Sequence, residues 1–142
     1  MKHLKTASYL IMVAFLINFT CSDNDSRFKS IRIGKDSFAT TISLNVGDTL
    51  IASLQSNPTT GYSWHLMKLD TGKIKLFESL YTQNKPAIPG NGGIESFRFI
   101  TIDHTDGGTT ELEMAYGQLG SMDTVPIDSF RVNLRIGCMM PD

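Results

Sequence analysis

The sequence predicts one all-β domain built as a β-sandwich, and three observations lead to this fold class. The chain has 142 residues, of which 41% are hydrophobic and 19% charged, which suits a single globular core. Twelve glycines and many serines and threonines favour strands and turns over helices. Apolar segments with strand periodicity follow one another at intervals of about 8 to 15 residues, with turn residues between them.

The first 20 residues are expected to form a secretory signal peptide that lies outside the fold. Lys2 and Lys5 precede the apolar run LIMVAFLINF at 10–19, which is too short to span a bilayer but suits the core of a signal. The chain is therefore expected to be exported. Loss of the two lysines lowers the basic residues from 13 to 11 against 14 acidic ones, a formal charge of -3. This mild charge gives no reason to expect a nucleic-acid partner.

The two cysteines, Cys21 and Cys138, allow two interpretations. Cys21 directly follows the apolar run and precedes a polar stretch, which resembles the lipidated first residue of a bacterial lipoprotein. Residues 21–30 would then be a polar tether to the cell envelope, and Cys138 a small buried hydrophobic residue. Asn18-Phe19-Thr20 lacks the usual lipoprotein pattern, so ordinary cleavage and secretion remain the alternative. Without lipid, a Cys21–Cys138 disulfide is the second possibility in an oxidising compartment.

Residues 31–142 are expected to form the sandwich. Residues 38–44 alternate apolar and polar, residues 45–48 form a turn, and the apolar run resumes at 49–54, which predicts a hairpin. Further strands are predicted at 62–67, 75–81, 94–103, 109–118 and 128–136. In the last of these, Phe130, Val132, Leu134 and Ile136 share one face, so each sheet is expected to have one solvated face. Trp64 is expected to pack in the core, and no helix is required.

The loop between the strands at 49–54 and 62–67 is chemically unusual. Pro58 cannot continue a strand ladder, so the strand must stop before it. Asn57 is expected to bond the backbone N–H two residues on, and Gly61 to take a positive φ. Thr59 and Thr60 are β-branched and have few rotamers to lose. Such a loop is stiff before it binds anything, although a turn selected only for its geometry is the simpler interpretation on mechanics alone.

Residues 57–64, Asn-Pro-Thr-Thr-Gly-Tyr-Ser-Trp, resemble the signature of the chagasin-like family, immunoglobulin-fold inhibitors of papain-like cysteine proteases. A second element of the family, Gly-x-Gly-Gly, is matched at 90–93 about thirty residues later, and the Phe-x-Val-x-Leu-x-Ile ending is also present. The resemblance implies an immunoglobulin-like β-sandwich of about seven or eight strands. It further implies a monomeric, reversible inhibitor that is not an enzyme and carries no cofactor.

The third family element, Arg-Pro-Trp after a strand ending in Tyr, is missing. Tyr116 is followed by Gly-Gln-Leu-Gly instead. An aromatic anchor is commonly worth about 2 to 4 kcal/mol at an interface, so its absence would weaken an otherwise nanomolar interaction by about tens to several hundredfold. The protease-binding residues that the resemblance implies are Asn57, Pro58, Thr59, Thr60, Gly61, Tyr62, Gly90, Asn91, Gly92, Gly93, Gln118 and Leu119. In the family the first loop enters the protease cleft and occludes it without chemistry.

Other site chemistries find little support in the residues. A phosphate-binding glycine loop needs a helix directly after it, whereas residues 94–99 have a strand pattern. His65 and His104 are isolated from any cysteine and show no metal-ligand spacing. Asp103, Asp106, Asp123 and Asp128 lie in expected turns and are interpreted as solvated caps. The alternative function is an envelope-attached immunoglobulin-like module for adhesion or binding, without a protease target.

Overall fold

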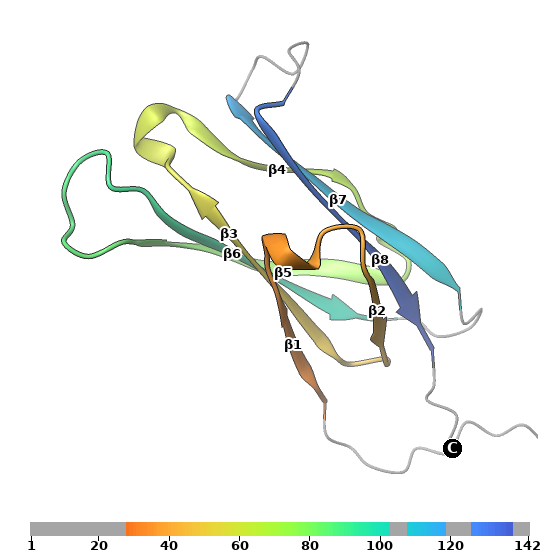
Figure 1. Ribbon diagram of the computed structural model, residues 1–142. Helices are drawn as coiled ribbons and strands as arrows, with labels where there is room; N and C mark the ends of the chain where they lie inside the picture. The colour runs from red at the N-terminus through yellow and green to blue at the C-terminus, as the bar shows by residue number, and fades with distance from the viewer. Residues whose placement is uncertain (1–27, 103–107, 119–125, 138–142) are drawn as a thin grey trace, which may run out of the picture.

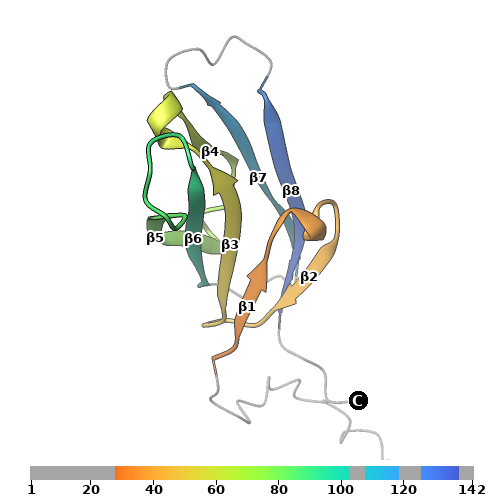
Figure 2. The ribbon, with the colours of Figure 1, turned by 60° about the vertical axis from the view of Figure 1, so that its left-hand side comes forward.

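The computed structural model describes residues 28–102, 108–118 and 126–137, and their strands form two packed four-stranded sheets (Figures 1 and 2). The first sheet has the order β1 (Ser30–Ile33), β3 (Thr49–Ser56), β6 (Gly93–Thr101), β5 (Ile74–Gln83). The second has the order β2 (Thr41–Leu44), β8 (Asp128–Ile136), β7 (Thr109–Gln118), β4 (Tyr62–Lys68). The predicted all-β sandwich is confirmed, and the strand limits from residue 49 onward lie within two residues of those expected.

Two single-turn 3-10 helices, η1 (Lys35–Ser37) and η2 (Pro58–Thr60), are additions that the strand periodicity does not predict. η1 lies in the connection between β1 and β2, and η2 lies between β3 and β4. Within the described ranges no helix is long and apolar enough to cross a membrane.

The predicted hairpin over residues 38–54 is wrong. β2 pairs in parallel with β8, with Ile42 opposite Leu134, whereas β3 pairs with β1 and β6 in the other sheet. The turn between β2 and β3 therefore carries the chain from one sheet to the other. Alternation of apolar residues gives each strand one buried face in both arrangements, so periodicity cannot distinguish a hairpin from a corner between sheets.

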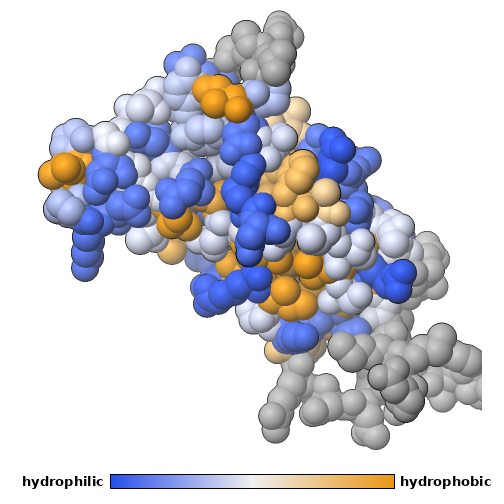
Figure 3. All heavy atoms as spheres, in the orientation of Figure 1, coloured by the Kyte–Doolittle hydropathy of each residue, from blue (hydrophilic) through white to orange (hydrophobic). Residues whose placement is uncertain are grey.

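The core lies between the two sheets. The predicted inward face of β8 is confirmed, because Phe130, Val132, Leu134 and Ile136 are all buried. Trp64 is also buried as expected, and its indole N–H donates to the Gln55 carbonyl oxygen at 2.8 Å. Figure 3 views the side of the sandwich where β1 and β2 lie, and it shows hydrophobic residues at the surface among hydrophilic ones. Ile31 of β1 and Ile42 of β2 are partly buried against the core.

The first described residues are fixed to the β2–β3 turn. The buried Asp48 carboxylate accepts hydrogen bonds from the backbone N–H of Lys29 and of Asn45, both at 2.8 Å. A Cβ on Gly47 would lie 2.1 Å from the Phe28 ring, so only glycine leaves room for that ring. β1 begins at Ser30, the last residue of the predicted tether. The predicted signal peptide, Cys21 and Cys138 lie outside the described residues.

Candidate functional site

The loop from residue 57 to residue 61, hereafter the wedge loop, is a single 3-10 turn that projects from the end of β3. β3 ends at Ser56, as Pro58 requires, and Gly61 adopts φ 82° and ψ 6° as predicted. The turn is closed by bonds from the Thr60 N–H to Asn57 O at 3.1 Å and from the Gly61 N–H to Pro58 O at 2.9 Å. Thr59 and Thr60 are exposed. Both threonines therefore lie at the surface in a backbone geometry that is already closed.

Asn57 holds the wedge loop together and ties it to two neighbouring segments. Its backbone N–H donates to the Tyr116 hydroxyl at 2.8 Å, and its side-chain amide donates to Gly90 O at 3.2 Å. The Thr59 hydroxyl donates to Asn57 Oδ1 and the Thr60 hydroxyl to Asn57 O, both at 2.6 Å. The prediction that Asn57 bonds the backbone N–H two residues on is wrong, because the hydroxyl of that residue takes the carboxamide oxygen instead.

Residues 84–92, hereafter the glycine loop, form a closed structure between β5 and β6. The Asn84 N–H donates to Gly92 O at 3.0 Å, and the Asn91 side-chain amide donates to Pro86 O at 2.8 Å. β6 begins directly after the loop, at Gly93, so a strand and not a helix follows the glycines, as predicted. The loop is therefore shaped by its own hydrogen bonds.

The three glycines Gly90, Gly92 and Gly93 have different structural environments. A Cβ on Gly93 would lie 2.2 Å from Thr82 O, and one on Gly92 would lie 3.1 Å from Ser56 O. These two glycines permit close approach within the chain itself, between neighbouring strands and loops. Gly90 has φ 82° and nothing within 4 Å of a Cβ position. Of the three, Gly90 is the one whose missing side chain leaves open space for a partner.

The end of β7 completes the same pole of the sandwich. Gln118 pairs with Tyr62 across the sheet, and its side-chain amide lies 3.4 Å from the Cβ position of Gly61. Behind the wedge loop, the Tyr116 ring packs against Tyr62 and Trp64 with centroid separations of 6.1 and 5.2 Å. Leu119 lies outside the described residues. The wedge loop, the glycine loop and Gln118 thus share one end, whereas β1 begins at the other (Figures 1 and 2).

Comparison with known proteins agrees with this arrangement. The sequence profile described as "Chagasin family peptidase inhibitor I42" matches residues 43–134, which is more than half of the chain. The chain belongs to this family. The match begins in β2 and ends in β8, so it includes all three segments that meet at the wedge-loop pole. No curated protein sequence matches the chain.

Two solved structures share the fold of this chagasin-family chain. One is the cysteine protease inhibitor EhICP2 from Entamoeba histolytica, with a TM-score of 0.64 and 18% identity, covering 76% of this chain and 95% of the other. The other is amebosin, with a TM-score of 0.59 and 20% identity, covering 76% of this chain and 97% of the other. The immunoglobulin-like β-sandwich that the family resemblance implies is thereby confirmed.

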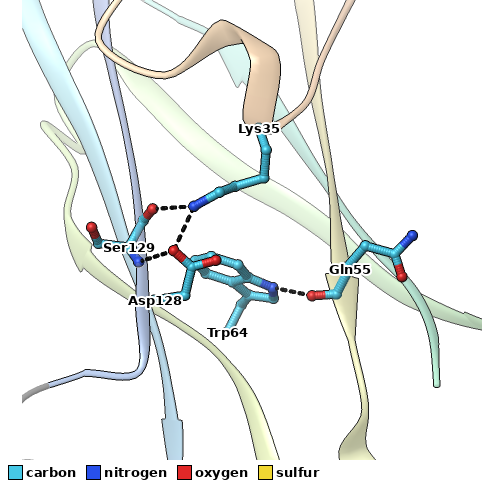
Figure 4. A network of polar contacts seen from close by, with 5 residues as sticks. All are labelled: Lys35, Gln55, Trp64, Asp128 and Ser129. Atoms are coloured by element: carbon cyan, nitrogen blue, oxygen red, sulfur yellow. Dashed lines mark hydrogen bonds and ion pairs between the residues drawn. The ribbon is translucent and has the colours of Figure 1, made fainter.

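One contact network behind the site is invisible to local sequence analysis (Figure 4). Lys35 of η1 reaches across to the start of β8, where its Nζ lies 2.6 Å from both Asp128 Oδ1 and Ser129 O. The same Nζ lies 5.6 Å from the centroid of the Trp64 ring. Asp128 was expected to be a solvated turn residue, yet it forms this exposed ion pair. No periodicity or motif connects residues 93 positions apart, so no sequence signal could have found the network.

The pole offers shape and hydrogen bonding more than reactive groups. Among the described residues no group of three His, Cys, Asp or Glu side chains is placed to hold a metal ion. His65 Nε2 lies 3.3 Å from Gly117 O and 3.4 Å from Ser63 Oγ, so strand neighbours surround it. His104 lies outside the described residues. The exposed threonines of the wedge loop and the open space beside Gly90 are the features that this pole presents to a partner.

Proposed function

We propose that this chain inhibits papain-like cysteine proteases reversibly, by inserting the wedge loop into the active-site cleft. Membership of the chagasin family supports protease inhibition as the function. The observation that carries the mode of inhibition is the position of the wedge loop. Its threonines are exposed, and it lies beside the glycine loop and Gln118 at one pole.

Preorganisation is the physical basis of the proposed affinity. Ordering a rotamer-rich side chain on binding costs about 0.5 to 1.5 kcal/mol. The hydroxyls of Thr59 and Thr60 are already bonded to Asn57 in the free chain, so little of that cost remains. Short branched side chains fill the cleft while presenting no scissile bond in a reactive orientation. Gly90, with open space at its Cβ position, lets the backbone of the glycine loop lie close against the protease.

The test is a titration of papain with the purified chain at micromolar concentration. We expect reversible, stoichiometric loss of activity that Thr60→Arg relieves without a change in melting temperature. Thr41→Arg is the matched control, because Thr41 is also an exposed threonine but lies on β2, outside the site. Failure to inhibit several papain-like proteases would overturn the proposal and favour an adhesion or binding module.

Export and lipid anchoring are part of the same proposal. A lipid on Cys21 would hold the chain at a membrane through residues 22–27, which precede the described part of the domain. β1 begins at the pole opposite the wedge loop, so an anchor there leaves the wedge loop free to meet a protease. Cys21→Ala should release the chain from the membrane fraction. Continued membrane association of that variant would count against lipidation.

A further inference from the structure

The outer faces of the two sheets differ in charge and polarity. On the outer face of the second sheet, four charged side chains neutralise one another, and Arg135 is the one cation of this face without an ion pair to a described residue. Glu111 lies 2.7 Å from Lys68 and 3.0 Å from Arg131, and Arg131 lies 2.9 Å from Glu113. The hydrogen bond from Lys68 lowers the pKa of Glu111, and the bond to Glu113 raises the pKa of Arg131. A face of this kind is well suited to water.

The outer face of the first sheet carries two cations that form no ion pair with a described residue. Strand register places Arg32, Ile51 and Arg98 in one row across β1, β3 and β6, and the next row pairs Ile100 with Lys75. Arg98 forms an ion pair with Glu78 at 2.9 Å. Arg32 and Lys75 form no ion pair with any described residue. The face therefore keeps a local positive charge although the whole chain is slightly acidic.

Large apolar side chains are exposed beside these cations. Phe77 is 76% exposed, Leu80 57% and Ile100 37%. Phe77 lies where the register of β5 against β6 shifts between Leu76 and Glu78. Such bulges redirect side chains, and this one places Phe77 at a groove of about 360 Å³ that Arg32 and Arg98 also line. The exposed Phe77 ring contributes nothing to the core, so contact with a partner surface is the better explanation for an aromatic residue at this bulge.

The position of the preceding chain indicates what that partner is. Ser30, the first residue of β1, lines the same groove, so the described part of the chain begins at the edge of this face. Cys21, the candidate lipid-bearing residue, is seven residues before Phe28, a span of at most about 25 Å for an extended chain. Basic residues interspersed with aromatic and aliphatic ones are the composition that binds the interface of an anionic bilayer.

We propose that this face of the first sheet rests on an anionic lipid bilayer. The contact surface consists of Arg32, Lys75, Phe77, Leu80, Arg98 and Ile100, hereafter the basic-apolar face. It lies in the half of the sheet nearer to the start of β1, and the wedge loop follows the far end of β3. The contact depends neither on lipidation of Cys21 nor on the wedge loop. An inhibitor held in this way keeps its protease-binding pole accessible at the membrane surface.

Depth-dependent quenching in the full chain tests which face touches lipid. The sequence has one tryptophan, Trp64, which is buried and gives a constant background. Tryptophan is introduced at Phe77, or at Asn133 as the control, an exposed residue on β8 in the other sheet. Vesicles contain brominated phosphatidylcholine and phosphatidylglycerol. We expect quenching at least about twofold stronger for Phe77→Trp than for Asn133→Trp. Any membrane binding through the residues before Phe28 is the same in both variants, so it cannot produce this difference.

Charge removal provides the second measurement. Each basic residue near an anionic surface contributes about fivefold in affinity, so Arg32→Gln with Lys75→Gln should weaken binding to phosphatidylglycerol vesicles about 30-fold. Arg135→Gln with Lys68→Gln, on the other sheet, should change it less than twofold. Equal quenching at both positions, equal losses in both double variants, or a lipid-free dimer that shields Phe77→Trp would each overturn the proposal. Inhibition of papain in solution stays unchanged throughout, so failure here is distinct from failure of the proposed function.

Discussion

Replacing Tyr116 by phenylalanine removes one oxygen atom from behind the wedge loop and leaves the ring in place. That hydroxyl accepts the hydrogen bond from the Asn57 N–H at 2.8 Å. Phenylalanine keeps the ring that packs against Tyr62 and Trp64, so the aromatic cluster is retained. The substitution therefore isolates one link between the core and the first residue of the wedge loop.

The magnitude follows from the burial of Asn57. A typical hydrogen bond contributes about 0.5 to 1.5 kcal/mol to stability, and Asn57 is only partly buried, so water can replace the lost partner. We expect the free energy of unfolding to fall by about 1 kcal/mol. The free energy of binding to papain should fall by more than the free energy of unfolding does, because a loosened wedge loop must be ordered again on binding. Two side chains at about 0.5 to 1.5 kcal/mol each raise the inhibition constant by roughly 5- to 150-fold.

The assay combines papain inhibition with urea denaturation of the same protein. Tyr81→Phe is the matched control, since the buried hydroxyl of Tyr81 has no hydrogen-bond partner among the described residues. Its loss should leave the inhibition constant unchanged and the stability equal or slightly higher. If Tyr116→Phe changes the inhibition constant by less than twofold, the claim that Asn57 preorganises the wedge loop is refuted.

Three further substitutions test the glycine loop, the first residue of β6 and the start of the domain. Gly93→Ala places a Cβ 2.2 Å from Thr82 O and should lower the free energy of unfolding by about 3 kcal/mol. Gly90→Ala places a Cβ with no atom within 4 Å, so it should lower the free energy of unfolding by only about 1 to 2 kcal/mol, because of the positive φ, while it weakens papain inhibition. Thermal denaturation and inhibition titrations measure both, and equal destabilisation by the two variants would contradict this assignment. Asp48→Ala leaves the N–H groups of Lys29 and Asn45 without their acceptor and should destabilise the domain by about 2 to 4 kcal/mol in urea, with inhibition by the folded fraction unchanged. A stability loss under 1 kcal/mol would show that water replaces the carboxylate.

Local patterns predicted the strands well, and contacts between distant segments poorly. The alternation over residues 128–136 identified β8 and its buried face, because side-chain direction in a strand depends only on position along it. The same reasoning failed for β2 and β3, whose partners depend on where the turn at 45–48 sends the chain. Likewise the backbone of the wedge loop followed from Pro58 and Gly61, but the bond from Asn57 to Gly90 joins residues 33 positions apart. Sequence reasoning assigned Gly92 and Gly93 to a partner surface, and it could not show that both glycines also permit close packing within the chain.

The two poles of the sandwich separate stability from recognition. At the pole where β1 begins, the buried Asp48 holds the first strand, and its loss affects folding. At the other pole, the hydrogen bonds of Thr59 and Thr60 are exposed, so they add little to the free energy of folding. Their effect is to restrict the wedge loop before binding. Gly117 and Gln118, which follow Tyr116 where the family carries Arg-Pro, pair with β4 and are not part of the buried core, so a departure from the family element at these positions leaves the core in place. Binding strength at this pole can therefore vary while the sandwich stays intact.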